Sequence, residues 1–214
     1  LGRMGITAGQ LSDINNIPQE YRLERKRIET IREVWIAETG TVTEAYEKLV
    51  EEFTFTLFNR LAALKVMEAH TLHPEIVTRR SQHGDRSFAH KHWLEQNPDG
   101  RNEEMEGLVR FMEDQLAELA TDIPLFSPQH PYHLLPTAIE LNGIMNAFKQ
   151  VETDAQVEDA IWQSDDVLGW LYESYNNYKK AAHKESGDKT EFNKVSIQSQ
   201  VYTPRWVVKF LVDN

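Results

Sequence analysis

The 214-residue sequence contains no cysteine. This absence excludes disulfides, thiolate nucleophiles and cysteine-ligated zinc sites, and it is typical of proteins from a reducing cytoplasm. Long hydrophobic runs are also missing, since no stretch approaches the roughly 20 consecutive apolar residues of a membrane span. The N-terminal residues lack the basic, apolar and small-residue order of a signal peptide. We therefore expect a cytoplasmic protein without a membrane partner.

Positive charge is scarce as well. Lys and Arg together number 23 against 34 Asp and Glu, which gives a formal net charge of −11. Phosphate binding is driven by basic side chains that displace counterions, so a chain whose whole surface grips nucleic acid is excluded. Any DNA contact must be local. Hydrophobic residues make up 40% of the chain and include five Trp, which is enough to bury a core.

Helical periodicity dominates the sequence. Thr41 and Glu44 predict a capping box, and apolar residues then recur at three- and four-residue steps until Pro74 breaks the chain. From Phe53 to Met67 these residues spread around the helix, so we expect it to be the central core helix. A second helix is predicted over 21–37, between Pro18 and Gly40. Its expected inward residues are Leu23, Ile28, Ile31 and Trp35, and its expected outward residues are Arg25, Lys26, Arg27 and Arg32.

Further helices are predicted over 103–120, 137–148 and 154–178. The region 78–100 predicts a polar, histidine-rich loop that closes on a turn at 97–100, and the proline-rich region 121–136 predicts a connector laid over the core. The region 179–194 loses its hydrophobicity and predicts a surface loop. No strand pattern is persuasive, and only 194–201 alternates. We expect an all-α, bundle-like domain over 1–180 and a loop or linker over 181–198. The residues 199–214 are expected to start a further domain.

The final segment, SQVYTPRWVVKFLVDN, begins a helix. Thr203 suits the N-cap and Pro204 the first helical position. A helix N-terminus carries free backbone donors and a partial positive charge, so it can hold a carboxylate or phosphate, with the hydroxyl of Tyr202 or Thr203 adding a directed bond. The alternative is an ordinary capped helix that packs its aromatic residues into a core.

Charged and histidine-rich clusters offer other candidate sites. The basic run of Arg22, Arg25, Lys26, Arg27 and Arg32 is interleaved with acids and favours a solvated face with ion pairs. The better DNA candidates are Arg79, Arg80, Arg86 and Lys91, which have fewer acidic neighbours. Acidic stretches at 103–106 and 152–159 suit a basic partner or imitation of DNA, or are merely solvated. Pairs at His70/His73, His90/His92 and His130/His133 fall short of the three or four ligands that zinc needs, so we predict no metal site.

Three segments together resemble a known family. The stretch QVYTPRWVVKFLV, 200–212, resembles the motif that opens the catalytic domain of many adenine-N6 DNA methyltransferases. FTFTLFNRLAALKVMEAH, 53–70, and DDVLGWLYESYNNYKK, 165–180, are similar to two segments that precede this motif in the adenine methyltransferases of bacterial BREX phage-defence systems, the PglX type. The three occur in the same order, and the resemblance spans roughly 41–214.

The resemblance implies a helical N-terminal domain followed by an α/β, Rossmann-like methyltransferase domain, of which only the first helix is present. It places Tyr202, Thr203 and Pro204 at the S-adenosylmethionine site, near the methionine carboxylate. It further implies a role in a phage-defence or restriction-modification system, with double-stranded DNA as substrate and other defence-system proteins as partners.

The sequence departs from the family by lacking the next motifs. Such an enzyme needs a glycine-rich turn at the cofactor and an Asn/Asp-Pro-Pro-Tyr/Phe loop that holds the extruded adenine. The ten glycines never form G-x-G, and the turn at 97–100 lacks the second proline and the aromatic. The segment alone is therefore predicted to be inactive, with no catalytic residue. The alternative is a non-enzymatic, acidic helical module that binds a protein partner or imitates DNA, and a stop codon after Asn214 would favour it.

Overall fold

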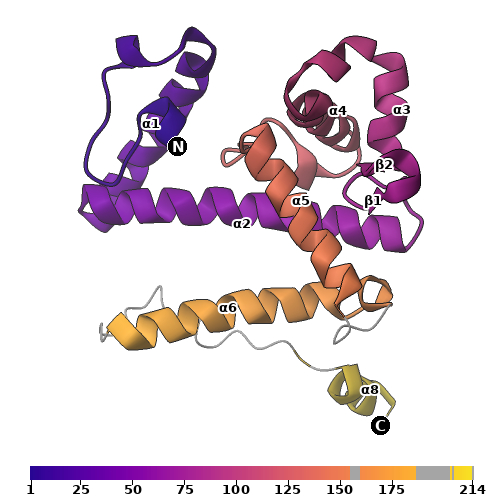
Figure 1. The fold of residues 1–214 in the computed structure, drawn as a ribbon. Helices are drawn as coiled ribbons and strands as arrows, with labels where there is room; N and C mark the ends of the chain where they lie inside the picture. Colours follow the sequence, from indigo (N-terminus) through magenta and orange to yellow (C-terminus); the bar gives the residue numbers. More distant parts are fainter. Residues whose placement is uncertain (155–159, 187–202, 204, 214) are drawn as a thin grey trace.

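The computed structural model describes residues 1–154, 160–186, 203 and 205–213 (Figure 1). Within these ranges the regular secondary structure is helical apart from one short hairpin and one isolated bridge, so the predicted all-α class is confirmed. The two strands of the hairpin, β1 (Arg79–Arg80) and β2 (Arg86–Ser87), are antiparallel. The α-helices are α1 (Arg22–Thr39), α2 (Val42–Ala69), α3 (Phe88–Gln96), α4 (Leu108–Leu119), α5 (Ala138–Thr153), α6 (Val167–Ser186) and α8 (Arg205–Asp213).

The long helix α2 is the axis of the fold. Figure 1 shows α1 beside its N-terminal half, α3 to α5 gathered over its C-terminal half, and α6 running along its other side. Its start is set by Thr41, whose hydroxyl accepts from the Glu44 amide at 3.2 Å and donates to the Glu44 carboxylate at 2.9 Å. The predicted N-cap is thus confirmed, although Glu44 bonds to the hydroxyl rather than reaching back to a backbone amide.

Two hydrophobic clusters meet on α2, as the predicted central core helix requires. The larger joins Leu61 and Leu64 of α2 to α3, α4 and α5. The smaller joins Leu49 and Phe53 to α1 and to the N-terminal residues around Met4. Burial of apolar surface on both sides of one helix fixes α1 relative to α3–α5 through α2.

The proline-rich connector 121–136 lies over the core, as predicted. Phe126 is fully buried and Leu135 nearly so. Arg60 of α2, also fully buried, donates to the carbonyl oxygens of Leu125 and Ser127, each at 2.8 Å. A segment with few backbone hydrogen bonds of its own is therefore held by a guanidinium that supplies several donors at once. The connector then enters α5 through a capping box formed by Thr137 and Glu140.

The prediction that Arg25 and Arg32 face outward from α1 is wrong, because both side chains are buried. The N-terminal residues wrap over this face of α1, and Arg25 donates to the carbonyls of Met4 and Ser12 and pairs with Glu29 at 2.9 Å. Leu23, which was expected to face inward, is 82% exposed. A chain segment rich in unpaired carbonyls favours a buried guanidinium over an aliphatic side chain.

Several predicted boundaries also differ. The loop expected over 78–100 is instead the β1–β2 hairpin followed by α3, and the helix expected from 103 begins only at Leu108. The helix expected over 154–178 is replaced by a 3-10 turn, Ile161–Gln163, and by α6, while 155–159 lie outside the described residues. Helix α6 continues to Ser186, past the predicted loop start at 181, and the alternating stretch 194–201 is not described.

The buried guanidinium of Arg25 gives a first prediction. We expect Arg25→Met to lower the free energy of unfolding by about 2 to 3 kcal/mol, because it removes the donor of two carbonyls and the partner of Glu29. Urea denaturation followed by circular dichroism measures this change. The matched control is Lys26→Met, at an exposed position of the same helix, which should change it by less than about 0.5 kcal/mol. Equal losses in both variants would contradict the structural role of Arg25.

Candidate nucleic-acid and cofactor sites

The four predicted DNA-contact residues lie on the β1–β2 hairpin and the helix that follows it. Arg79 and Arg80 form β1, Arg86 begins β2, and Lys91 lies on α3. The register places Arg80 opposite Arg86. The hairpin passes directly into α3 because the side chain of Ser87 caps this helix, accepting from the His90 amide at 3.2 Å. The structure thus brings three of the four residues onto one two-stranded ribbon and the fourth onto the adjoining helix.

The three arginines are already engaged within the fold. Arg80 donates twice to Glu75, at 2.9 and 2.6 Å, and Arg86 makes a bidentate pair with Glu106. These hydrogen bonds to carboxylates raise the pKa of both arginines. Arg79 donates to the side chain of Asn142 on α5, and burial lowers its pKa. The charges of Arg80 and Arg86 are largely neutralised by these carboxylates, which weakens the local field available to a phosphate, whereas Arg79 is bonded to a neutral amide and is half-buried.

Lys91 differs from these arginines. Its side chain is exposed, and among the described residues no ion pair involves it. It therefore offers an unshielded positive charge beside the hairpin. Unlike Arg80 and Arg86, Lys91 can meet a phosphate without displacing a carboxylate, and unlike the half-buried Arg79 its side chain is exposed.

Arg86 belongs to a small cluster that shapes the start of α4. Met105 and Glu106 both have left-handed backbone conformations, with φ of 50° and 56°. Glu106 is held there by Arg86 through its carboxylate and by His90, whose Nε2 donates to its carbonyl at 2.9 Å. The His90 ring stacks on Phe111 at 4.7 Å, and burial lowers its pKa, so the ring is neutral at pH 7. This cluster stabilises a backbone shape that non-glycine residues rarely adopt.

The turn at 97–100 is a packing element of the core. Trp93 is buried and donates from its indole to Asp114 at 2.8 Å. A Cβ on Gly100 would lie 2.6 Å from the Trp93 ring, so only glycine allows the chain to pass there. The prediction that this Asn-Pro-Asp-Gly stretch is a plain turn agrees with the structure, in which the turn packs closely against the buried Trp93 side chain.

The histidine pairs do not form a metal centre in the described part of the chain, where no group of three or more His, Asp or Glu is suitably placed. His133 instead accepts from Arg60 at Nδ1 and donates from Nε2 to Glu113 at 3.0 Å. His130 accepts from the Tyr132 amide at 3.2 Å. Both rings hold the connector in place, a role that nothing in their spacing indicates.

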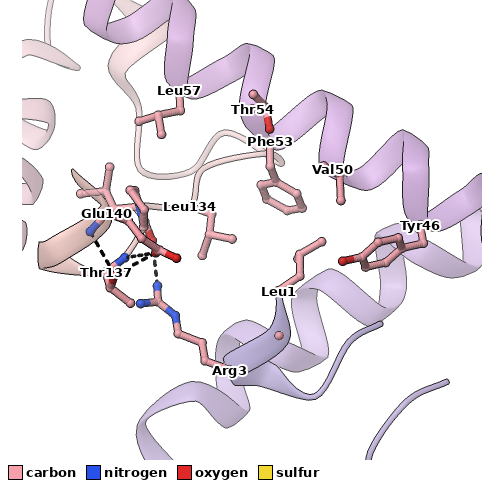
Figure 2. A pocket seen from close by; sticks show the side chains of 13 residues that line it. Leu1, Arg3, Tyr46, Val50, Phe53, Thr54, Leu57, Leu134, Thr137 and Glu140 are labelled. Carbon is pink, nitrogen blue, oxygen red and sulfur yellow. Dashed lines mark hydrogen bonds between the residues drawn. The ribbon is translucent and has the colours of Figure 1, made fainter. Parts of the chain in front are cut away.

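A pocket of about 380 Å³ lies between the N-terminal residues, α2 and the end of the connector (Figure 2). Apolar side chains that include Val50, Phe53 and Leu134 make up most of its wall. Its polar groups are used by the fold, since Arg3 donates to the Leu135 carbonyl at 2.7 Å and Glu140 is bonded by Thr137. The pocket is assembled from three segments far apart in the sequence, so no local pattern could predict it.

A second polar site was also not predicted. Lys65 of α2 is buried, yet it bonds to Thr78 and Glu152 and lies 3.8 Å from Glu68. Glu68 in turn accepts from the amide of Ile76 and from the hydroxyl of Thr78, each at 2.6 Å. The sequence signal is that Lys65 and Glu68 interrupt a mainly apolar stretch of α2. Through this network two segments are attached to α2: the residues that lead into β1, and the C-terminal end of α5.

Of the predicted cofactor residues the structure describes only Thr203, because Tyr202 and Pro204 lie outside the described residues. Thr203 is exposed, and α8 begins at Arg205. Two aromatic side chains of α8 are largely exposed, Trp206 at 72% and Phe210 at 63%. The alternative of an ordinary helix that packs these aromatics into the domain's own core is therefore not supported.

None of the described helices is both long and apolar enough to cross a lipid bilayer.

Comparison with known proteins places the chain among relatives of adenine-specific methyltransferases. BrxX of Escherichia coli O9:H4 (strain HS), named an adenine-specific methyltransferase, is 26% identical in an alignment that covers 80% of this chain and 15% of that protein. PglX of Lacticaseibacillus casei (strain Zhang), named likewise, is 26% identical in an alignment that covers 92% of this chain and 18% of the relative. The predicted resemblance to BREX-type methyltransferases is thus confirmed.

The chain spans less than one fifth of the length of these curated relatives. No family model matches the chain, and no solved structure matches it.

The cluster around Arg86 gives a second prediction. Arg86→Met should lower the free energy of unfolding by about 1 to 2 kcal/mol, because it leaves the Glu106 carboxylate without its partner in a left-handed turn. Lys91→Met, nearby on an exposed surface, should change it by less than about 0.5 kcal/mol. Thermal or urea unfolding of the two variants distinguishes a structural arginine from a free surface lysine. A neutral Arg86→Met would show that the turn does not depend on the pair.

Proposed function

We propose that this chain is the N-terminal helical region, with the first cofactor segment, of a site-specific adenine-N6 DNA methyltransferase. The parent protein acts in a bacterial phage-defence or restriction-modification system, with S-adenosylmethionine as methyl donor and double-stranded DNA as substrate. The observation that carries the proposal is the similarity of 80 to 92% of the chain to two proteins named as adenine-specific methyltransferases. The rival, a non-enzymatic acidic module, has no comparable support.

The proposal assigns different roles to the two ends of the chain. The helical domain ends with α6, which runs to Ser186 rather than to the predicted boundary at 180. The residues from there to 198 connect it onward, and 199–214 open the catalytic domain. Tyr202, Thr203 and Pro204 lie beside the methionine carboxylate of the cofactor, where the N-terminus of α8 supplies free amides and a favourable dipole. The start of α8 at Arg205, two residues after Thr203, supports this assignment.

The chemistry belongs to residues outside this segment. Transfer of the methyl group from the sulfonium to the amino group of an extruded adenine needs a loop that grips the base and accepts hydrogen bonds from the amino group. The resemblance assigns this work to an Asn/Asp-Pro-Pro-Tyr/Phe loop, and the 214 residues contain no such sequence. The segment alone is accordingly inactive.

Contact with DNA by the helical domain, where it occurs, involves the face formed by Arg79, Arg80, Arg86 and Lys91. Lys91 supplies the free charge. The Arg80 side chain is 51% exposed, so a phosphate can approach it in competition with Glu75. Arg79 and Arg86 contribute by holding the hairpin in position beside α5 and the turn before α4.

The proposed activity is tested in the organism that carries the gene. Deletion of the gene should abolish N6-methyladenine at one DNA sequence motif, because each enzyme of this kind marks its own site. Methylation-sensitive long-read sequencing of genomic DNA measures the loss. The full-length gene should restore the mark, whereas residues 1–214 alone should not. An unchanged methylation pattern after deletion would rule the proposal out.

The missing motifs lead to a further prediction about the cofactor. Residues 1–214 should show no tight binding of S-adenosylmethionine by isothermal titration calorimetry, since a single helix terminus makes few contacts. The full-length protein should bind it. A dissociation constant for the segment below about 1 μM, equivalent to roughly 8 kcal/mol, would mean that most of the cofactor pocket is already present.

A further inference from the structure

A groove of about 480 Å³ lies between α2 and α6. Its walls come from Phe58, Ala62 and Ala63 of α2 and from Leu168, Gly169 and Leu171 of α6. The two helices meet at an aromatic contact, where Phe55 stacks on Tyr175 with centroids 5.0 Å apart. Protein interiors are close-packed, so an apolar space of this size beside a helix contact is a place for another group.

The groove has the chemistry of a protein interior. None of its lining residues carries a charge, and three of them, Ala62, Ala63 and Gly169, are small enough to let a backbone or a bulky side chain approach. Asn59 is the amide among them, and no hydrogen bond involves its side chain in the described part of the chain. A partner segment with apolar side chains and one polar group near Asn59 would complement this surface.

Exposed apolar residues are concentrated near this groove and on α8. Of the sixteen large hydrophobic residues that are exposed in the described ranges, eight belong to α6 and α8. These are Leu168, Trp170, Tyr172, Trp206, Val208, Phe210, Leu211 and Val212. The others are spread over the first 151 residues, as single surface hydrophobics usually are. A concentration of this kind marks a surface that another part of a protein covers.

We propose that the α2–α6 groove is the junction where the helical domain receives a segment of the catalytic part of the full-length methyltransferase. This inference rests on the proposed function, which supplies the catalytic part. The matched region is 15 to 18% of each relative, so more than four fifths of the relatives' length is available to cover it. Helix α8, which opens the catalytic segment, shares the apolar exposure of α6, and one body packed on both would bury the two surfaces together.

Thiol labelling tests the junction, because the 214 residues contain no cysteine. Ala63→Cys places a thiol in the groove, and Ala117→Cys, at an exposed position of α4, is the matched control. Each variant is made in residues 1–214 and in the full-length protein, and maleimide labelling of the peptide that carries the new thiol is followed by mass spectrometry. Labelling at 63 should be at least tenfold slower in the full-length protein, and labelling at 117 should be the same in both.

Equal labelling rates at 63 would overturn the proposal. Protection at 63 in residues 1–214 alone, rising with protein concentration, would overturn it too, because a second copy would then be the occupant. Asn59→Cys is read in the same way if Ala63→Cys does not fold. The outcome can be distinguished from that of the methylation test. An active enzyme with an unprotected groove defeats only the junction. A protected groove without methylation defeats the proposed function, and the groove is then a junction with a part of the protein that is not a methyltransferase.

Discussion

The structure depends on buried charged side chains of α2 that find their partners in irregular segments. Arg60 holds the connector through the carbonyls of Leu125 and Ser127, and Glu68 holds the entry to β1 through the Ile76 amide and the Thr78 hydroxyl. A charge buried without partners is very costly, so each loop is fixed where its carbonyls or amides meet the charge. The helices supply apolar burial, and these ionic anchors determine where the chain between them runs.

Because these buried charges bond to segments outside their own helix, the helices could be predicted from local patterns but the contacts between segments could not. Elements with their own periodicity and caps were found with nearly correct ends, as α1 between Pro18 and Gly40 and α2 after Thr41 show. Helix α3 was missed because its segment is short and histidine-rich, and its inward residues, His90 and Trp93, use polar atoms as well as burial. Arg25 was placed on the wrong face because its partners are carbonyls far away in the sequence.

For the candidate sites, too, some features could be predicted from the sequence and others depend on the fold. The family resemblance was visible in three ordered segments, since it is a property of the sequence, and the relatives confirm it. The sequence does not reveal which basic side chains are paired with a carboxylate, because this depends on which acidic residue the fold brings close to each arginine. Glu106 reaches Arg86 only through a left-handed turn, and Glu75 reaches Arg80 only because β1 follows closely. Lys91 alone among the four keeps an exposed charge with no ion pair in the described residues.

Helix α6 extends well beyond the point where it contacts α2. It is held against α2 near its middle by the ring stack of Phe55 and Tyr175, and it continues as a helix to Ser186. From Tyr175 to Ser186 a helix extends about 16 Å, so a tilt of about 10° at the ring stack moves the far end by about 3 Å. A small tilt of the helix about this contact would therefore displace its far end by a distance comparable to the length of a hydrogen bond.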